Sequence, residues 1–145
     1  MEHGAIGMSA LRAMPLFAGV GGHDLENILK LGQLKTYQAG QTIIERGEPG
    51  DSLYIILRGA AGVDAGGSHH DLKDGDFFGE MALIAGRART ATVKAVESVE
   101  VLTIGAQDFQ RFALHHPQVG LAMLKGLVER LREVQGRVEG WTGSG

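Results

Sequence analysis

Hydrophobic and polar positions change their spacing twice along the chain and divide it into three regions. Residues 8–34 carry apolar side chains at helical spacing, with an interruption at Pro15. Residues 34–104 consist of short runs of β-branched and aromatic residues between glycine or aspartate turns, which is typical of β-strands. Helical spacing returns at Ala106 and continues, after a break at Pro117, nearly to the end of the chain. The pattern predicts helices at both ends around a central β region.

Eight short segments of the central region have the length and composition of strands. Their spacing of roughly 8–12 residues suggests a barrel, a roll or a sandwich. Between residues 90 and 95 alternate side chains are apolar, so this strand is expected to bury one face. Residues 81–85 are helix-prone and too few for more than one or two helical turns. The predicted strands are residues 35–38, 41–46, 52–58, 62–65, 69–73, 76–78, 89–96 and 99–104.

The last predicted helix carries an apolar stripe with heptad-like spacing. Six residues form it: Leu124, Leu127, Leu131, Val134, Val138 and Trp141. The stripe fits two alternatives, packing on its own domain or pairing with a second copy of the chain. Gly136 and Gly140 each weaken the helix by about 1 kcal/mol relative to alanine. We therefore expect residues 139–145 to be a disordered tail.

Composition and charge narrow the class of protein. A chain of 145 residues suits one domain, and 43% hydrophobic with 21% charged residues excludes wholesale disorder. The net charge of −3 argues against a basic face for direct contact with nucleic acid or a membrane. No apolar run approaches the roughly 18–20 residues of a membrane span, and the N-terminus lacks the pattern of a secretory signal. The expected compartment is the cytoplasm, which includes the cytosolic part of a membrane protein.

Catalytic metal and thiol chemistry finds little support in the sequence. The chain has no cysteine, which excludes disulfides and thiol catalysis. A cupin-like metal site needs a His-x-His pair, but His69 and His70 are adjacent and would point to opposite faces of a strand. The pair His115 and His116 is also badly placed to chelate one ion. We therefore expect a protein that is not an enzyme and holds neither a metal nor a cofactor.

The segment between Gly79 and Arg89 combines features that suit a sugar phosphate. Gly79 permits close approach of the backbone, and the first amides of the short helix after it lack intrahelical partners and attract an anion. Arg89 can bind the same anion through two parallel hydrogen bonds. Glu80 would be repelled by the phosphate unless it accepts a hydrogen bond from a hydroxyl. The spacing alone fits equally well a surface Glu80–Arg89 ion pair that caps the helix.

The motifs Phe-Gly-Glu-Met-Ala-Leu at residues 78–83 and Arg-Thr-Ala-Thr-Val at residues 89–93 resemble the phosphate-binding cassette of the cyclic nucleotide-binding domain family. This family includes regulatory subunits of cyclic AMP-dependent protein kinase, cyclic nucleotide-gated channels and the catabolite activator protein. The resemblance implies an α+β, mainly β fold. It consists of an eight-stranded antiparallel β-roll (a double-stranded β-helix, jelly-roll-like) with N-terminal helices, a short phosphate-cassette helix and two C-terminal helices. The domain is expected at residues 14–138, after an N-terminal extension at 1–13.

The resemblance also implies roles for individual residues. Glu80 would bind the ribose 2′-hydroxyl and Arg89 the cyclic phosphate, while the amides of Ala82 and Ala91 complete the anion cage. Thr90 stands where some family members discriminate between purines, and its hydroxyl is compatible with cyclic GMP and with cyclic AMP. The expected ligand-binding residues are Gly79, Glu80, Met81, Ala82, Arg89, Thr90, Ala91, Val63, Arg130 and Val134.

The far end of the expected site is less sharply defined. Val63 and Leu72 are expected either to line the purine pocket or to pack in the core. In family members the final helix closes over the base, which is where Arg130 and Val134 would fall. Arg130 is then expected to stack on the purine or to approach the phosphate. The alternative is a solvated arginine beside two glutamates.

The predicted function is a regulatory sensor domain that binds cyclic AMP or cyclic GMP as a small-molecule ligand. Binding would pass a conformational change through the C-terminal helix to a linked effector or to a second copy in a homodimer. Two alternatives are a degenerate module that only dimerises or docks, and a cupin-like metalloenzyme. Intact Glu80 and Arg89 argue against the first alternative, and the spacing of the histidines argues against the second.

Overall fold

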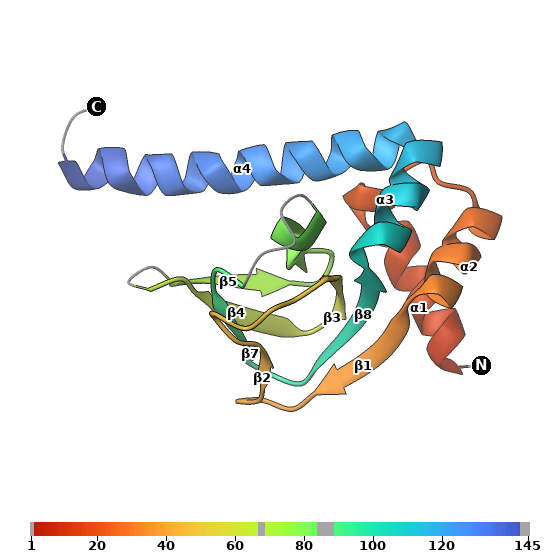
Figure 1. Ribbon diagram of the computed structural model, residues 1–145, viewed down its shortest axis with the longest axis horizontal. Coiled ribbons are helices and arrows are strands. Elements are labelled where there is room, and N and C mark those ends of the chain that lie inside the picture. The colour runs from red at the N-terminus through yellow and green to blue at the C-terminus, as the bar shows by residue number, and fades with distance from the viewer. Residues whose placement is uncertain (1, 67–68, 84–88, 143–145) are drawn as a thin grey trace.

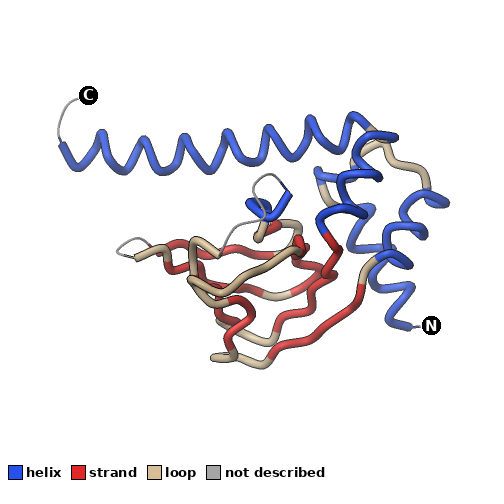
Figure 2. Tube along the Cα trace, in the orientation of Figure 1, coloured by secondary structure: helices blue, strands red, loops and turns tan. Residues whose placement is uncertain are grey.

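The chain folds into a β-roll with helices at one end and one long helix across it. In the computed structural model, helices α1, α2 and α3 gather at one end of the roll, and α4 extends past it (Figure 1). The tube in Figure 2 shows the same separation of helices and strands. The structure describes residues 2–66, 69–83 and 89–142, and side chains within 7–66, 69–80, 82–83 and 89–133.

Two four-stranded antiparallel sheets form the roll, with the strand orders β1-β8-β3-β6 and β2-β7-β4-β5. The predicted eight-stranded antiparallel roll with flanking helices is therefore confirmed, with shifts of a few residues at the ends of elements. The strands are β1 (Gln33–Tyr37), β2 (Thr42–Ile44), β3 (Ser52–Arg58), β4 (Ala60–Asp64), β5 (His69–Lys73), β6 (Phe77–Phe78), β7 (Thr92–Ala95) and β8 (Val99–Gly105). The helices are α1 (Glu2–Ala13), η1 (Pro15–Phe17), α2 (Gly22–Leu31), η2 (Glu80–Leu83), α3 (Ala106–His115) and α4 (Pro117–Thr142).

Strands β3 and β8 pair antiparallel at the centre of the molecule and are buried on both faces. Leu53 and Ile55 of β3 face the helices, whereas Ile56 faces the inside of the roll. This alternation follows from the two-residue period of a strand. The continuous run of hydrophobic residues 53–57 therefore contributes to two separate hydrophobic clusters, one under the helices and one inside the roll.

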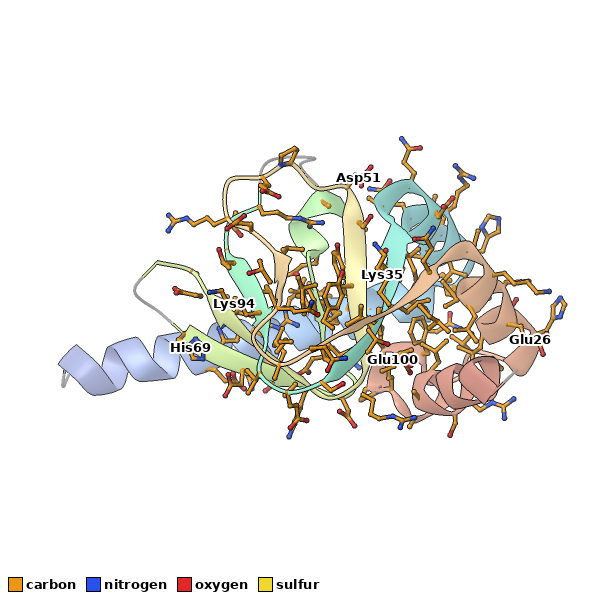
Figure 3. All side chains as sticks on the ribbon, turned by 90° about the horizontal axis from the view of Figure 1, so that it is seen from below. Glu26, Lys35, Asp51, His69, Lys94 and Glu100 are labelled. Carbon is orange, nitrogen blue, oxygen red and sulfur yellow. The ribbon has the colours of Figure 1, made fainter. Side chains whose placement is uncertain are left out.

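The interior of the roll is apolar, and polar side chains such as those of Lys94 and His69 are exposed (Figure 3). In β7 Val93 is buried and Lys94 is exposed, as the alternation in the sequence predicts. Tyr37 packs against the interior cluster. Burial raises the pKa of the Tyr37 hydroxyl, and the neighbouring Tyr54 raises it further.

Gly59 shows why glycine is needed at one reversal of the chain. It joins β3 to β4 with φ of +105°, where a Cβ would lie 2.3 Å from the carbonyl oxygen of Ser98. Any other residue would therefore be strained and would clash with backbone. The Gly59 amide donates a hydrogen bond of 2.8 Å to Asp74, which fixes the turn.

The terminal helices form where the spacing predicts them. Pro15 begins η1 and Pro117 begins α4, where proline costs no hydrogen bond. Leu11 of α1 is buried in the cluster under the helices, so this segment packs on the roll. The division into an extension, a domain and a tail stays a prediction, since α4 continues to Thr142 and residues 143–145 lie outside the described residues.

Helix α4 presents two different faces, and the predicted stripe is divided between them. Leu127 packs against the buried cluster. Leu124 and Leu131, by contrast, are 56% and 57% exposed. Leu121 and Val128 are exposed as well. The side chains of Val134, Val138 and Trp141 lie outside the described residues. No helix in the described part of the chain is long and apolar enough to cross a membrane.

Candidate functional site

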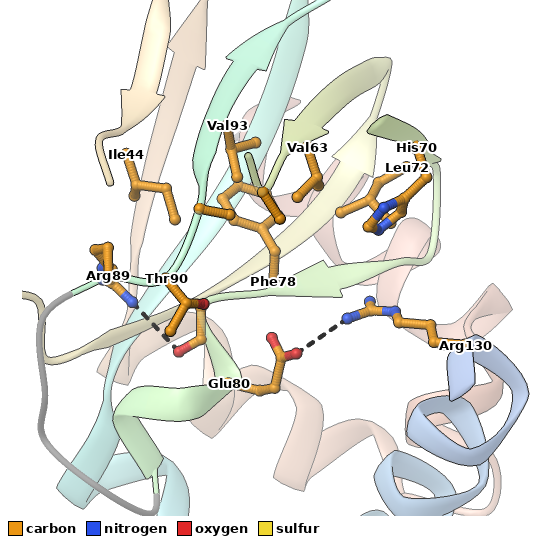
Figure 4. A pocket seen from close by; sticks show the side chains of 13 residues that line it. Ile44, Val63, His70, Leu72, Phe78, Glu80, Arg89, Thr90, Val93 and Arg130 are labelled. Atoms are coloured by element: carbon orange, nitrogen blue, oxygen red, sulfur yellow. Dashed lines mark hydrogen bonds and ion pairs between the residues drawn. The ribbon is translucent and has the colours of Figure 1, made fainter. Parts of the chain in front are cut away.

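A cavity of about 220 Å³ lies between the β2-β7-β4-β5 sheet and the turn η2 (Figure 4). Its wall is apolar on the side of the sheet and charged on the side of η2 and α4. The residues that line it are Ile44, Val63, Ala65, His70, Leu72, Phe78, Gly79, Glu80, Arg89, Thr90, Ala91, Val93 and Arg130.

The apolar wall comes from paired strands. Val63 of β4 is directly opposite His70 of β5 on one side and Val93 of β7 on the other. Directly opposed residues point to the same face of a sheet, as do residues two apart, so His70 and Leu72 share this face. Val63 and Leu72 also belong to the buried cluster inside the roll. The two expected roles of Val63 and Leu72, as pocket wall and as core, therefore coincide.

Gly79 brings the backbone close to the side chain of Arg89. Its φ is +80°, and a Cβ there would lie 2.9 Å from the carbonyl oxygen of Ser52 and 2.9 Å from Nη1 of Arg89. Only glycine adopts this conformation without strain and leaves this space. The predicted need for glycine at the start of the turn thus has a steric cause.

Arg89 is held by backbone groups on several sides. Its Nη1 donates to the carbonyl of Gly79 at 3.3 Å, and its Nη2 donates to the carbonyl of Ser52 at 3.0 Å. The main chain of Arg89 is fixed by Glu48, whose carbonyl accepts from the Arg89 amide at 2.8 Å. The guanidinium also lies 5.7 Å from the centre of the Tyr54 ring. An arginine has five N–H donors, so the two donors bound to carbonyls orient the group without exhausting it.

Glu80 pairs with Arg130 of α4. Nη1 of Arg130 lies 3.2 Å from Oε1 of Glu80, and the two side chains are only 24% and 21% exposed. Sequence spacing suggested a surface ion pair of Glu80 with Arg89. The structure instead joins Glu80 to a residue fifty positions away.

Arg130 makes two further contacts, both with Phe77. Its Nη2 donates to the Phe77 carbonyl, and its guanidinium lies 4.5 Å from the centre of the Phe77 ring. Such a contact is a cation–π interaction. Arg130 is therefore not a solvated side chain, because it is mostly buried and lines the cavity (Figure 4).

Only some of the remaining predicted residues line the cavity. Thr90 and Ala91 line the cavity. The Ala82 amide donates to the Gly79 carbonyl at 3.2 Å, so in this structure the turn itself uses that donor. The side chains of Met81 and Val134 lie outside the described residues, as do residues 84–85 of the predicted cassette helix.

The sequence interpretation missed His70 as a lining residue. Its signal was present, because His70 stands two residues before Leu72 and shares its face. His69 points the other way and lies 3.1 Å from Asp71, where both side chains are exposed. Within the part of the chain that the structure describes, no group of three or more histidine, aspartate or glutamate residues could hold a metal ion.

Comparisons with known proteins agree with this geometry. The model of the cyclic nucleotide-binding domain matches residues 34–116. A cyclic nucleotide-gated potassium channel of Mesorhizobium japonicum is 37% identical over 118 residues, which are 81% of this chain and 33% of the channel. A cAMP-dependent protein kinase regulatory subunit of Eremothecium gossypii is 37% identical over 103 residues, which are 70% of this chain and 22% of the subunit. The chain thus spans a third or less of these two relatives.

Among solved structures, the catabolite activator protein of Thermus thermophilus superposes with a TM-score of 0.73 at 28% identity. The match covers 88% of this chain and 63% of that protein. The family model covers more than half of the chain and includes all eight strands except the first residue of β1. On these grounds, together with the cavity formed by Gly79, Glu80 and Arg89, the chain belongs to the cyclic nucleotide-binding domain family.

Proposed function

We propose that this domain binds a cyclic purine nucleotide, cyclic AMP or cyclic GMP, in the cavity between the sheet and η2. The observation that carries the proposal is the lining of this cavity. It places a guanidinium and a carboxylate, Arg89 and Glu80, opposite an apolar wall. A cyclic nucleotide has a matching set of groups, namely one anionic phosphate, one ribose hydroxyl and one flat apolar base.

Each part of the ligand has a complementary group. The phosphate binds to the remaining N–H donors of Arg89, because charge-assisted hydrogen bonds to a guanidinium are strong. The 2′-hydroxyl donates to Glu80, whose Oε2 is not the oxygen that contacts Arg130. The base packs on Val63 and Leu72, which removes apolar surface from water. Thr90 is compatible with either purine.

Helix α4 would carry the signal out of the domain. The turn η2 is connected to α4 through Glu80 and Arg130. It is also connected to α3, since Gln110 donates a hydrogen bond to the Leu83 carbonyl. A ligand that moves η2 therefore acts on both helices, and it shifts their equilibrium only by its differential affinity for the two positions. The receiver is a linked effector or a second copy of the chain, in a cytosolic setting and without a catalytic role for this domain.

Calorimetric titration with four nucleotides tests the binding. Cyclic AMP or cyclic GMP should bind, whereas 5′-AMP should bind far more weakly because its phosphate carries more charge and is not closed into a ring. The 2′-deoxy analogue of cyclic AMP should bind about 10-fold more weakly than cyclic AMP, because it leaves Glu80 without its donor. Absence of binding by both cyclic nucleotides would refute the proposal. Equal binding of the 2′-deoxy analogue would refute the role of Glu80.

A further inference from the structure

Gly126 lies within helix α4 at a position where the backbone conformation does not require a glycine. It does not have the positive φ that favours glycine elsewhere in the chain. Inside a helix glycine is less favourable than alanine, because it loses more conformational freedom on folding. The reason for a glycine at this position therefore lies in the space around it.

The space beside Gly126 is taken by the ring of Phe77 in β6. A Cβ at position 126 would lie 3.3 Å from Cε2 and 3.5 Å from Cζ of this ring. The optimal separation of two carbon atoms is about 3.5–4.0 Å, so a Cβ would press on the ring. Phe77 is only 5% exposed and belongs to the cluster under the helices, and a close-packed interior leaves the ring little room to retreat. Gly126 therefore allows α4 to lie closer to β6 than a residue with a side chain would.

Arg130 follows Gly126 by one helical turn and contacts the same ring. Residues four apart lie on one face of a helix, and the Arg130 guanidinium is 4.5 Å from the centre of the Phe77 ring. Its Nη2 also donates a hydrogen bond to the Phe77 carbonyl. Both residues of α4 therefore rest on Phe77, so the separation of α4 from β6 determines how far the Arg130 side chain reaches past the ring.

The reach of Arg130 decides its contact with Glu80. Nη1 of Arg130 lies 3.2 Å from Oε1 of Glu80 (Figure 4). A cavity of about 460 Å³, with Phe77, Gly126 and Arg130 in its wall, separates α4 from β5 beside these contacts. The contact with Phe77 therefore sets the height of α4 above the roll at this point. A lift of α4 by about 0.5 Å would stretch the contact with Glu80 past the hydrogen-bonding range.

We propose that Gly126 is a positioning residue for the nucleotide site. Because it has no side chain, α4 approaches β6 so closely that Arg130 holds one oxygen of Glu80 and leaves the other oriented toward the ribose hydroxyl. A larger residue would hold α4 away from Phe77 and free the Glu80 carboxylate to rotate. This inference rests on the proposed function, since it assumes that Glu80 binds the ribose.

The test compares a substitution of Gly126 with the same substitution of Gly120, which also lies in α4. A Cβ at Gly120 would have no atom of the described residues within 4 Å, so Gly120→Leu adds a helix-forming residue without a clash. Calorimetry measures the affinity for the cyclic nucleotide that the wild type binds more tightly and for its 2′-deoxy analogue. The ratio of these two affinities reports on the contact between Glu80 and the ribose.

We expect a ratio of about 10 in the wild type and in Gly120→Leu, and a ratio at least threefold lower in Gly126→Leu. If Gly126 contributed only to packing, Gly126→Leu would weaken the binding of both ligands equally and leave the ratio unchanged. In the Arg130→Ala background, Gly126→Leu should have no further effect on the ratio, because the contact that it disturbs is already absent.

The same ratio can overturn the inference. If it is unchanged in Gly126→Leu, or falls equally in Gly120→Leu, the positioning role fails and the proposed function stands. A fall of equal size in the Arg130→Ala background would show that Gly126 does not act through Arg130. If the wild type binds neither cyclic AMP nor cyclic GMP, the proposed function fails and the positioning role with it. Circular dichroism shows whether Gly126→Leu is folded, and if it is not, Gly126→Ala is compared with Gly120→Ala instead.

Discussion

The two arginines that line the cavity lie at its opposite ends and are held by different contacts. Arg89, at the end proposed to bind the phosphate, donates to two main-chain carbonyls, those of Gly79 and Ser52. Arg130 at the other end depends on one carboxylate and on contacts with Phe77. Carbonyls beside the strands cannot move without disturbing the roll, whereas Arg130 moves with its own side chain or with α4. The position of the Arg89 side chain is therefore fixed by the roll, whereas the position of the Arg130 side chain can change.

Of the substitutions that test this comparison, removal of Arg89 should have the largest effect, which is on nucleotide affinity. Arg89→Ala should weaken binding of cyclic AMP by about 100-fold, because charged hydrogen bonds in a partly buried site contribute about 1.5–3 kcal/mol each. Arg89→Lys should recover only part of the loss, since an ammonium cannot copy the planar fork. Calorimetry measures both affinities. Binding by Arg89→Ala as tight as that of the wild type would exclude Arg89 from the phosphate site.

Gly79→Ala should destabilise the fixed end by about 1–3 kcal/mol, because the residue would keep a positive φ and its Cβ would clash with backbone. Gly40→Ala is a control with φ of +88° but no atom within 4 Å of the added Cβ. Urea unfolding of both variants separates the conformational cost from the clash. Equal destabilisation would show that the contact with the Ser52 carbonyl does not contribute to the free energy of unfolding.

Disruption of the adjustable end should cost less stability. Arg130→Ala is expected to lower the free energy of unfolding by about 1 kcal/mol, because the Arg130–Glu80 pair is only partly buried. A double-mutant cycle with Glu80→Gln isolates the pair, and a coupling energy of about 0.5–1 kcal/mol is expected. Additive effects of the two substitutions would indicate that the contact with Phe77, and not the ion pair, holds Arg130.

The smallest effect is expected on the outer face of α4. The double substitution of Leu124→Gln and Leu131→Gln should leave nucleotide affinity unchanged and shift stability by less than about 0.5 kcal/mol, because both side chains are largely exposed. Leu127→Ala should destabilise more, since Leu127 packs against the core. Thermal unfolding and calorimetry measure these quantities. A loss of affinity in the double variant would show that the two faces of α4 do not act separately.

Much of this organisation could be predicted from the sequence. The two-residue alternation at residues 90–95 predicted that β7 buries one face, and Pro117 marked the start of α4. The cassette motif also identified Gly79, Glu80 and Arg89 as neighbours. The strand and the helix start are local features, because they depend on residues a few positions apart and on fixed backbone geometry. The grouping of the cassette residues was implied by the resemblance to a known family.

The partner of Glu80 could not be predicted in this way. Spacing allowed an ion pair with Arg89, nine residues along the chain, yet the contact is made by Arg130. The division of the apolar stripe on α4 could not be predicted from the sequence either, because Leu124 and Leu127 differ only in which side of the helix meets the core.

The sequence by itself determined the strands and the glycine turns, because these follow from backbone sterics and short-range periodicity. It also contained the groups that suit a sugar phosphate, and the resemblance of its cassette motif to a known family implied a cyclic nucleotide. Only the tertiary structure decided where the cavity ends. That boundary depends on how the last helix crosses the roll, and the crossing is fixed by packing between residues such as Phe77 and Gly126 that are far apart in the chain.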